Sequence, residues 1–198
     1  MSQRITMRIE DGVADVRLAR PERMNALDLP MFDALIDAGA ALARDGAVRA
    51  VVLSGEGRAF CAGLDMAEMA RLAGTAGEKM PPVATRTHGI ANRFQQAVMT
   101  WRDCPIPVIA AMHGVAFGGG FQLALGADIR YVTPDVKMAI MEIKWGLVPD
   151  MGGILLAPRL ARDDILRELT YTGRVFSGRE ALEYGFATRV ADDPLAAA

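Results

Sequence analysis

The order of apolar and polar residues predicts a chain that alternates strands with helices. Residues 14–18 alternate apolar with polar side chains, which predicts a strand with one buried face. Apolar residues of 29–43 recur at helical spacing behind Asp28, a suitable N-cap, and predict a helix. The apolar run 50–53 is short, continuous and followed by a Ser-Gly-Glu-Gly turn. We therefore expect a strand there that is covered on both faces.

The same succession of elements recurs further along the chain. A helix is predicted over 90–101 and a second buried strand over 108–111, followed by a glycine turn that opens another helix. The remaining predictions are a loop over 73–87, strands at 129–132 and 137–140, a loop at 146–153, a helix at 154–160, and a last helix begun by the capping box of Ser177 and Glu180 and ended by Gly185. This repetition of strand, glycine loop and helix predicts a layered α/β fold.

Composition and charge narrow the class of protein. The 198 residues are 52% hydrophobic and 23% charged, which is typical of a globular chain with a sizeable core. We expect one domain over residues 1–190 and a short tail over 191–198. The 22 basic and 24 acidic residues give a net charge of −2 without a basic block, so nucleic acid and anionic membranes are not expected partners. A small molecule or another protein is the partner that this composition favours.

The apolar and sulfur-containing segments place the protein in a reducing compartment. Residues 104–127 carry no formal charge, but two prolines and five glycines interrupt them, so we expect burial in protein instead of a membrane span. Cys61 and Cys104 stand 43 positions apart and form no disulfide framework. The two histidines create no metal-ligand spacing, and the N-terminus lacks a secretory apolar core. A cytoplasmic protein without a bound metal is expected.

Two glycine loops are the candidates for chemistry. A dinucleotide fingerprint at Gly118 and Gly120 fails because Leu123 holds the place of the third glycine, and no Gly-x-Ser-x-Gly elbow exists. What remains is a first glycine loop, residues 59–65, and a second, residues 114–120, each behind a predicted buried strand. Such loops can aim backbone N–H groups at one point and form an oxyanion hole. The alternative is that their glycines only permit tight turns.

Five segments in order resemble the enoyl-CoA hydratase/isomerase (crotonase) family. They span nearly the whole chain and are residues 20–27 (RPERMNAL), 60–65 (FCAGLD), 113–120 (HGVAFGGG), 127–130 (ADIR) and 146–150 (GLVPD). The resemblance implies a spiral of repeated ββα units, with a C-terminal helical region that is shorter than usual in the family. It also implies a thioester oxygen held by the N–H groups of Ala62 and Gly119, which stabilise a developing negative charge by about 3 to 4 kcal/mol each.

The resemblance further implies an acyl-CoA ligand and an assembly. Coenzyme A is expected as part of the substrate, with no permanently bound cofactor, and the family usually forms homotrimers or dimers of trimers. The positions that match substrate-binding or CoA-binding segments are Arg23, Met24, Ala26, Ala62, Gly63, Leu64, Asp65, Met66, Gly119, Gln122 and Trp145.

Acid and base groups decide which reaction is expected. Hydratases of the family use two glutamates, whose positions here are held by Gln122 and Glu142. Because an amide does not exchange a proton at neutral pH, the pair that would activate a water is incomplete. Glu142 is placed at a strand end, where burial would raise its pKa and suit it to proton transfer. The alternative is a surface carboxylate.

Asp150, eight residues beyond Glu142, completes the expected site. Glu and Asp at this spacing are similar to the pair of the dienoyl-CoA isomerases, whose third acid again falls on Gln122. A plain helix N-cap is the alternative for Asp150. The sequence thus favours an isomerase that shifts a double bond of an enoyl- or dienoyl-CoA, with water addition second and a catalytically silent CoA-thioester-binding subunit as the rival.

Overall fold

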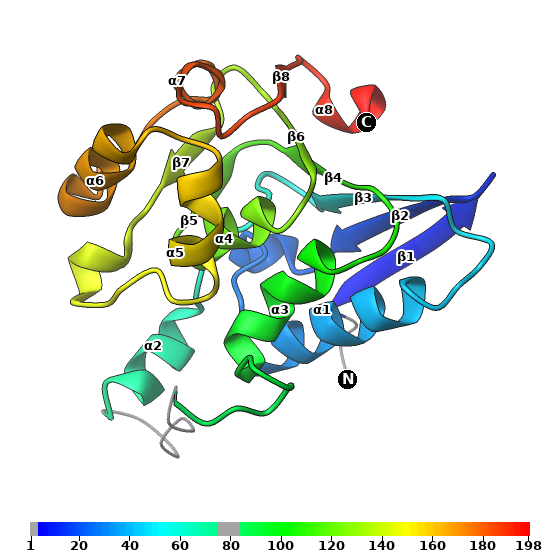
Figure 1. The fold of residues 1–198 in the computed structure, drawn as a ribbon, viewed down its shortest axis with the longest axis horizontal. Helices are drawn as coiled ribbons and strands as arrows, with labels where there is room; N and C mark the ends of the chain where they lie inside the picture. The colour runs from blue at the N-terminus through cyan, green and yellow to red at the C-terminus, as the bar shows by residue number, and fades with distance from the viewer. Residues whose placement is uncertain (1–3, 75–83) are drawn as a thin grey trace.

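The computed structural model describes residues 4–74 and 84–198, and a twisted sheet forms its frame (Figure 1). Its strands, in spatial order, are β1 (Ile5–Glu10), β2 (Val13–Leu18), β3 (Ala50–Gly55), β4 (Val108–Met112), β6 (Ile129–Val132) and β8 (Arg189–Val190). β1 runs antiparallel to β2, and all later neighbours pair in parallel. The strands predicted at 14–18, 50–53, 108–111 and 129–132 are confirmed.

The β1–β2 hairpin, whose first strand was not predicted, turns at an Asp-Gly pair. Asp11 and Gly12 have φ values of 50° and 80°, and Glu10 pairs directly with Val13. Two central residues with positive φ are typical of the tight turn that matches the twist of a hairpin. In β3, five of six residues are buried, as expected of a strand covered on both faces.

A second, smaller sheet gives the fold its spiral. β5 (Val115–Phe117) pairs in parallel with β7 (Lys137–Ala139), and Cys61 forms a parallel bridge to Ala116. Successive passes of the chain thus leave one strand in the main sheet and one in the small sheet before a helix or loop returns. The predicted ββα spiral is confirmed, but residues 115–117 form a strand where only a glycine turn was predicted, because they find a partner in β7.

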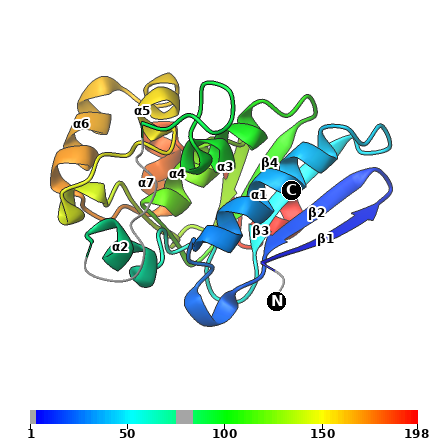
Figure 2. The ribbon, with the colours of Figure 1, turned by 90° about the horizontal axis from the view of Figure 1, so that it is seen from below.

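Two capped helices cover the main sheet (Figure 2). α1 (Leu29–Leu42) begins at Asp28, whose Oδ1 accepts the N–H of Met31 at 3.0 Å, and α3 (Arg93–Arg102) begins at a capping box. The two helices pack together, with the rings of Phe32 and Phe94 edge to face at 5.0 Å between centroids. α4 (Gly119–Leu125) is buried along its whole length, so it carries its side chains into the centre of the molecule.

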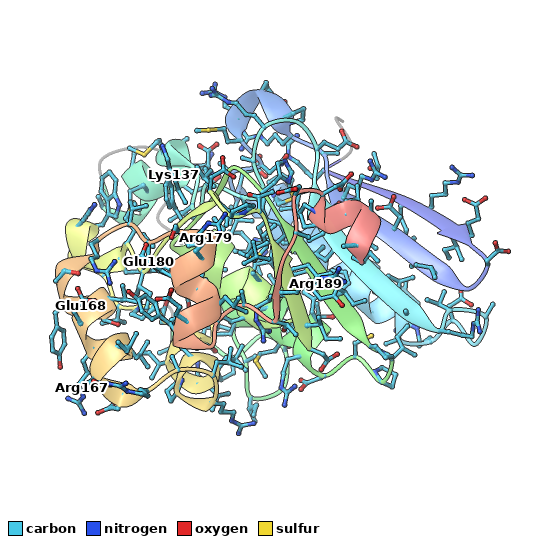
Figure 3. All side chains as sticks on the ribbon, turned by 90° about the horizontal axis from the view of Figure 1, so that it is seen from above. Lys137, Arg167, Glu168, Arg179, Glu180 and Arg189 are labelled. Atoms are coloured by element: carbon cyan, nitrogen blue, oxygen red, sulfur yellow. The ribbon has the colours of Figure 1, made fainter. Side chains whose placement is uncertain are left out.

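The C-terminal half of the chain consists mainly of short helices, and the last of them packs against β4 and β6 of the main sheet. They are α5 (Gly153–Leu156), α6 (Asp163–Thr172), α7 (Gly178–Tyr184) and α8 (Pro194–Ala197). The 3-10 turn η2 (Glu142–Trp145) precedes α5, η3 (Ala157–Arg159) follows it directly, and η1 (Pro21–Arg23) lies earlier in the chain. Arg174 joins α6 to α7 through Glu168 at 2.8 Å and Glu180 at 3.0 Å, and Figure 3 shows both glutamates on their neighbouring helices.

Most of the predicted helices are confirmed, with differences at their ends and two omissions. The helix predicted at 154–160 is α5 continued by η3, the tail 191–198 contains α8, and α6 and α2 (Met66–Leu72) were not predicted. The central part of the loop predicted at 73–87 lies outside the described residues. Within the described part of the chain, no helix has the length and apolar character needed to cross a bilayer.

Candidate active site

One cavity of about 390 Å³ collects most of the side chains singled out by the sequence. The first and second glycine loops, η2 and the segment before α5 form its wall. The predicted residues that line it are Ala62, Gly63, Leu64, Met66, Gly119, Gln122, Glu142, Trp145 and Asp150. Apolar side chains such as Phe32, Phe94 and Met151 complete the wall, so the cavity offers a largely apolar space with a few polar groups.

The N–H of Ala62 is not available to a ligand. It donates to the backbone oxygen of Met24 at 2.9 Å, so the prediction that it forms one half of an oxyanion hole is wrong for this structure. The physical reason is that segment 24–27 runs beside the first glycine loop and uses this donor to hold the loop in place.

Leu64, two residues further on, supplies a free donor in the same loop. The N–H of Leu27 donates to the oxygen of Gly63 at 2.8 Å, and the N–H of Asp65 donates to the oxygen of Leu27 at 2.9 Å. In a parallel bridge of this kind the residue between the two bonds turns its own N–H to the opposite side. Across the described residues, the N–H of Leu64 has no acceptor, and Leu64 lines the cavity.

Gly119 supplies a second free donor beside the first. It is the first residue of α4, and among the parts of the chain described here its N–H has no acceptor. A Cβ built on Gly63 would lie 3.6 Å from the nitrogen of Gly119 and only 2.6 Å from the oxygen of Phe117, so the two glycine loops touch. Gly63 has φ +92°, where a side chain is strained, and glycine is therefore required at this crossing.

Asn25 holds the first glycine loop, and the sequence analysis missed it. Its side chain is fully buried and donates to the oxygens of Glu56 and Ala59 at 2.9 and 2.8 Å, while its Oδ1 accepts the N–H of Arg20 at 2.8 Å. Met24 and Asn25 both have positive φ, a conformation in which asparagine is enriched. An Asn behind an Arg-Pro turn was the available signal for this clamp.

Glu142 lies at the bottom of the cavity. It is the first residue of η2, three positions beyond the end of β7, so its placement at a strand end was off by a short connection. The side chain is buried at 8% exposure, and burial raises its pKa, which outweighs the opposing effect of a hydrogen bond from Gln122. Oε1 accepts the Gln122 Nε2 at 2.6 Å, whereas Oε2 is buried and has no hydrogen-bond partner in the described structure. The alternative of a surface carboxylate is wrong.

Asp150 faces the same cavity from the segment before α5. Burial raises its pKa, and its negative charge adds to the rise in the pKa of Glu142. The residue at the N-cap of α5 is Gly152, without any side-chain cap, so the alternative of Asp150 as a helix cap is wrong. Its backbone oxygen accepts Nε2 of Gln95 at 3.1 Å, which ties this segment to α3.

Other predicted binding residues serve the framework or lie apart. Asp65 caps α2 and pairs with Arg20 at 2.6 Å. Arg23 is exposed and Ala26 is buried, and neither of them, nor Met24 or Asp65, lines the cavity. Their contact with a CoA group stays a prediction.

The buried thiol near the site is not a reactive one. Burial raises the pKa of Cys61 to about 12, and its Sγ donates to the oxygen of Asn25 at 3.1 Å. In residues 4–74 and 84–198 no group of three or more His, Cys, Asp or Glu side chains could hold a metal ion.

Known proteins match both the sequence and the fold. The family model described as enoyl-CoA hydratase/isomerase matches residues 8–195. Mitochondrial Delta(3,5)-Delta(2,4)-dienoyl-CoA isomerase of Mus musculus is 34% identical over 91% of this chain, and 1,2-epoxyphenylacetyl-CoA isomerase of Escherichia coli is 34% identical over 98%. The chain covers 56% of the first relative and 71% of the second, and so spans little more than half the length of the curated dienoyl-CoA isomerases that it matches from mammals.

Solved structures of this family superpose on the chain. An enoyl-CoA hydratase/isomerase from Mycobacterium paratuberculosis superposes with a TM-score of 0.86 at 30% identity, over all of this chain and 76% of that one. A putative enoyl-CoA hydratase from Thermobifida fusca, in complex with CoA, gives 0.83 at 33% identity over 96% and 72% of the two chains. The match over almost the whole chain, together with the spiral fold, shows that the protein belongs to the enoyl-CoA hydratase/isomerase family.

Proposed function

We propose that this protein shifts a double bond of an enoyl- or dienoyl-CoA thioester by proton transfer. One observation carries the proposal: a buried carboxyl group with an unpaired oxygen, Glu142 Oε2, shares a cavity with two free backbone N–H groups, those of Leu64 and Gly119. The N–H groups suit the oxygen of a thioester as it gains negative charge. The carboxyl group suits a carbon-bound proton beside that thioester.

The reaction balances within the site without a further reactant. Glu142 takes a proton from the carbon next to the thioester, and the electron pair of the broken C–H bond moves onto the thioester oxygen, where Leu64 and Gly119 stabilise the enolate. Asp150 gives a proton to a carbon further along the acyl chain, and the electron pair returns to form the new double bond. The step needs an ionised Glu142 and a protonated Asp150, and burial raises the pKa of both carboxyl groups, which favours keeping a proton in the site.

Water addition, the alternative reaction, would need a second carboxylate at the position of Gln122. Gln122 holds the position beside Glu142, and its amide neither takes nor gives a proton at neutral pH. Relatives named as isomerases and others named as a probable enoyl-CoA hydratase or a carnitinyl-CoA dehydratase both match this chain, so the relatives alone do not choose between the two reactions. The rival of a silent CoA-thioester binder is disfavoured by the buried, ionisable pair.

We further propose that CoA enters as part of the substrate and that the chain works as a homotrimer or a dimer of trimers. A family member was solved with CoA, which supports the first point. The exposed apolar side chains of Ile154 and Leu155, 61% and 54% exposed, support contact with another subunit. Sedimentation at several concentrations tests the assembly. A cytoplasmic location stays a prediction, because relatives include mitochondrial and peroxisomal enzymes.

The decisive experiment incubates the protein with a 3,5-dienoyl-CoA and follows the product by absorbance and mass. We expect a product of unchanged mass whose double bonds are conjugated with the thioester carbonyl. We also expect that Glu142→Gln loses turnover and still binds the CoA thioester. In a parallel incubation with a 2-enoyl-CoA, whose double bond is conjugated with the thioester, a product heavier by one water would establish hydration instead. Binding without any product from either a conjugated or an unconjugated thioester would establish the silent binder.

A further inference from the structure

Gln122 occupies a place that neither a substrate-binding nor a proton-transfer role explains. Its side chain is 3% exposed and forms two hydrogen bonds, one on each side of the amide. Oε1 accepts the backbone N–H of Gly153 at 2.9 Å, and Nε2 donates to Oε1 of Glu142 at 2.6 Å. The amide thus joins the first residue of α5 to the proposed base.

The N–H of Gly153 dictates which way the amide faces. A backbone N–H only donates, so it must meet the amide oxygen of Gln122, and the amide NH₂ group must then point to Glu142. Packing holds the same arrangement, because a Cβ built on Gly153 would lie 2.7 Å from Oε1 of Gln122 and 3.0 Å from its Cγ. The amide therefore has one orientation.

The fixed amide makes the two oxygens of Glu142 unequal. Oε1 faces an N–H donor and can only accept, so when Glu142 carries a proton that proton resides on Oε2. Oε2 is the oxygen that is buried without a hydrogen-bond partner. We propose that Gln122 is a positioning residue, which through Gly153 holds Glu142 so that Oε2 alone exchanges protons with the substrate. This inference rests on the proposed function.

The same arrangement leaves Gln122 little capacity to orient a water for attack. Gly153 uses one acceptor site of its oxygen and Glu142 uses one of its two N–H bonds, and the amide has no proton to exchange with a water at neutral pH. Asp150 is the ionisable neighbour whose charge also acts on Glu142, and replacing Gln122 does not change that residue.

The test replaces Gln122 by Met, which has a similar length and no donor, and measures the titration of Glu142 by NMR of carbon-labelled glutamate in the protein without substrate. We expect the pKa of Glu142 to rise further, because the carboxylate loses a charge-assisted hydrogen bond. We also expect the acidic limb of the kcat/KM profile to move to higher pH and kcat to fall about tenfold or more, with KM little changed. Gln96→Met, on the half-buried face of α3, is the matched control and should change neither quantity.

Two further variants keep the inference falsifiable if Gln122→Met folds poorly. Gly153→Ala leaves the chemistry of Gln122 intact but pushes its amide, and it should move the titration of Glu142 in the same direction. Gln122→Glu should raise the pKa of Glu142 strongly, because a like charge replaces a donor. An unchanged titration and pH profile in folded Gln122→Met would overturn the inference. A different result would separate the two proposals: no isomerase activity in the wild-type protein, together with a pKa of Glu142 that rises in Gln122→Met. This result would remove the proposed function and leave the hydrogen-bond role of Gln122 standing.

Discussion

Replacing the single N–H of Leu64 by an ester oxygen is the sharpest test of the proposed oxyanion hole. Incorporation of the α-hydroxy acid that corresponds to leucine removes this donor and keeps the side chain. Since the N–H of Leu64 has no acceptor in the described fold, its loss costs the folded state no hydrogen bond of its own. Loss of one oxyanion donor lowers kcat by about 10²- to 10³-fold, or about 2.7 to 4 kcal/mol. We expect that loss in a stopped-flow isomerase assay, with KM little changed.

The same replacement at Ala62 is a closely matched control. Each ester also weakens the preceding carbonyl, and each of those accepts one backbone bond: Gly63 from Leu27 at 2.8 Å and Cys61 from Phe117 at 3.1 Å. The variants therefore differ in the N–H itself. At Ala62 the lost donor held Met24 at 2.9 Å, so this variant should lose about 1 kcal/mol more of unfolding free energy than the Leu64 variant and keep most of its kcat.

The reverse pattern would refute the assignment of the N–H of Leu64 as the oxyanion donor. An Ala62 ester that is catalytically crippled but fully stable, beside a Leu64 ester with normal kcat, would return the donor role to Ala62. Normal kcat in both variants would remove the first glycine loop from the chemistry altogether.

Three further predictions concern the proposed base Glu142, Asn25, which holds the first glycine loop, and Gly63, where the two glycine loops touch. Because the pKa of Glu142 is raised in the folded state, that state holds its proton to higher pH than the unfolded chain does, and stability falls as pH rises through this window. Glu142→Gln should make this fall smaller in urea unfolding compared between about pH 4 and pH 7, and the part that remains comes from Asp150, whose pKa is also raised. Asn25→Ala should lower the unfolding free energy by about 2 to 4 kcal/mol, because buried backbone groups lose their hydrogen-bond partner and alanine is strained at a positive φ. An Asn25→Gly variant relieves only the strain, so its unfolding free energy should be about 1 kcal/mol higher than that of Asn25→Ala. Gly63→Ala should fold with a displaced second glycine loop and lose kcat about 10²-fold or more in the same assay, whereas Gly46→Ala, where an added Cβ meets nothing, should keep full activity.

Local signals accounted for much of the fold. The helix behind Asp28 and the last helix between Ser177 and Gly185 follow from capping residues and apolar spacing, and both lie where they were predicted. The omission of α6 was avoidable, because Ile165, Leu166 and Leu169 have the spacing of one helical face. α2 is different, because it has only seven residues. It is capped by Asp65, and Asp65 forms an ion pair with Arg20, which is distant in the sequence.

The predictions for the site named acidic residues that line the cavity and misassigned one backbone donor. Glu142 and Asp150 were predicted because their positions match acidic residues of the family that the five segments resemble, and the cavity brings them together. The donor in the first glycine loop was misassigned because the choice depends on which N–H a distant segment consumes. Met24 takes the N–H of Ala62, and Leu27 turns that of Leu64 outward, which no spacing within the loop can reveal.

The deep burial of Cys61 has a consequence for how the protein would fare under oxidative stress. Because burial raises the pKa of Cys61 to about 12, the thiol stays protonated at neutral pH, and the thiolate is the form that peroxides and alkylating agents attack. Of the two sulfhydryl groups, the half-buried Cys104 would be modified first. Damage would then begin at a position that does not line the cavity, while the sulfur of Cys61 within the first glycine loop stays reduced.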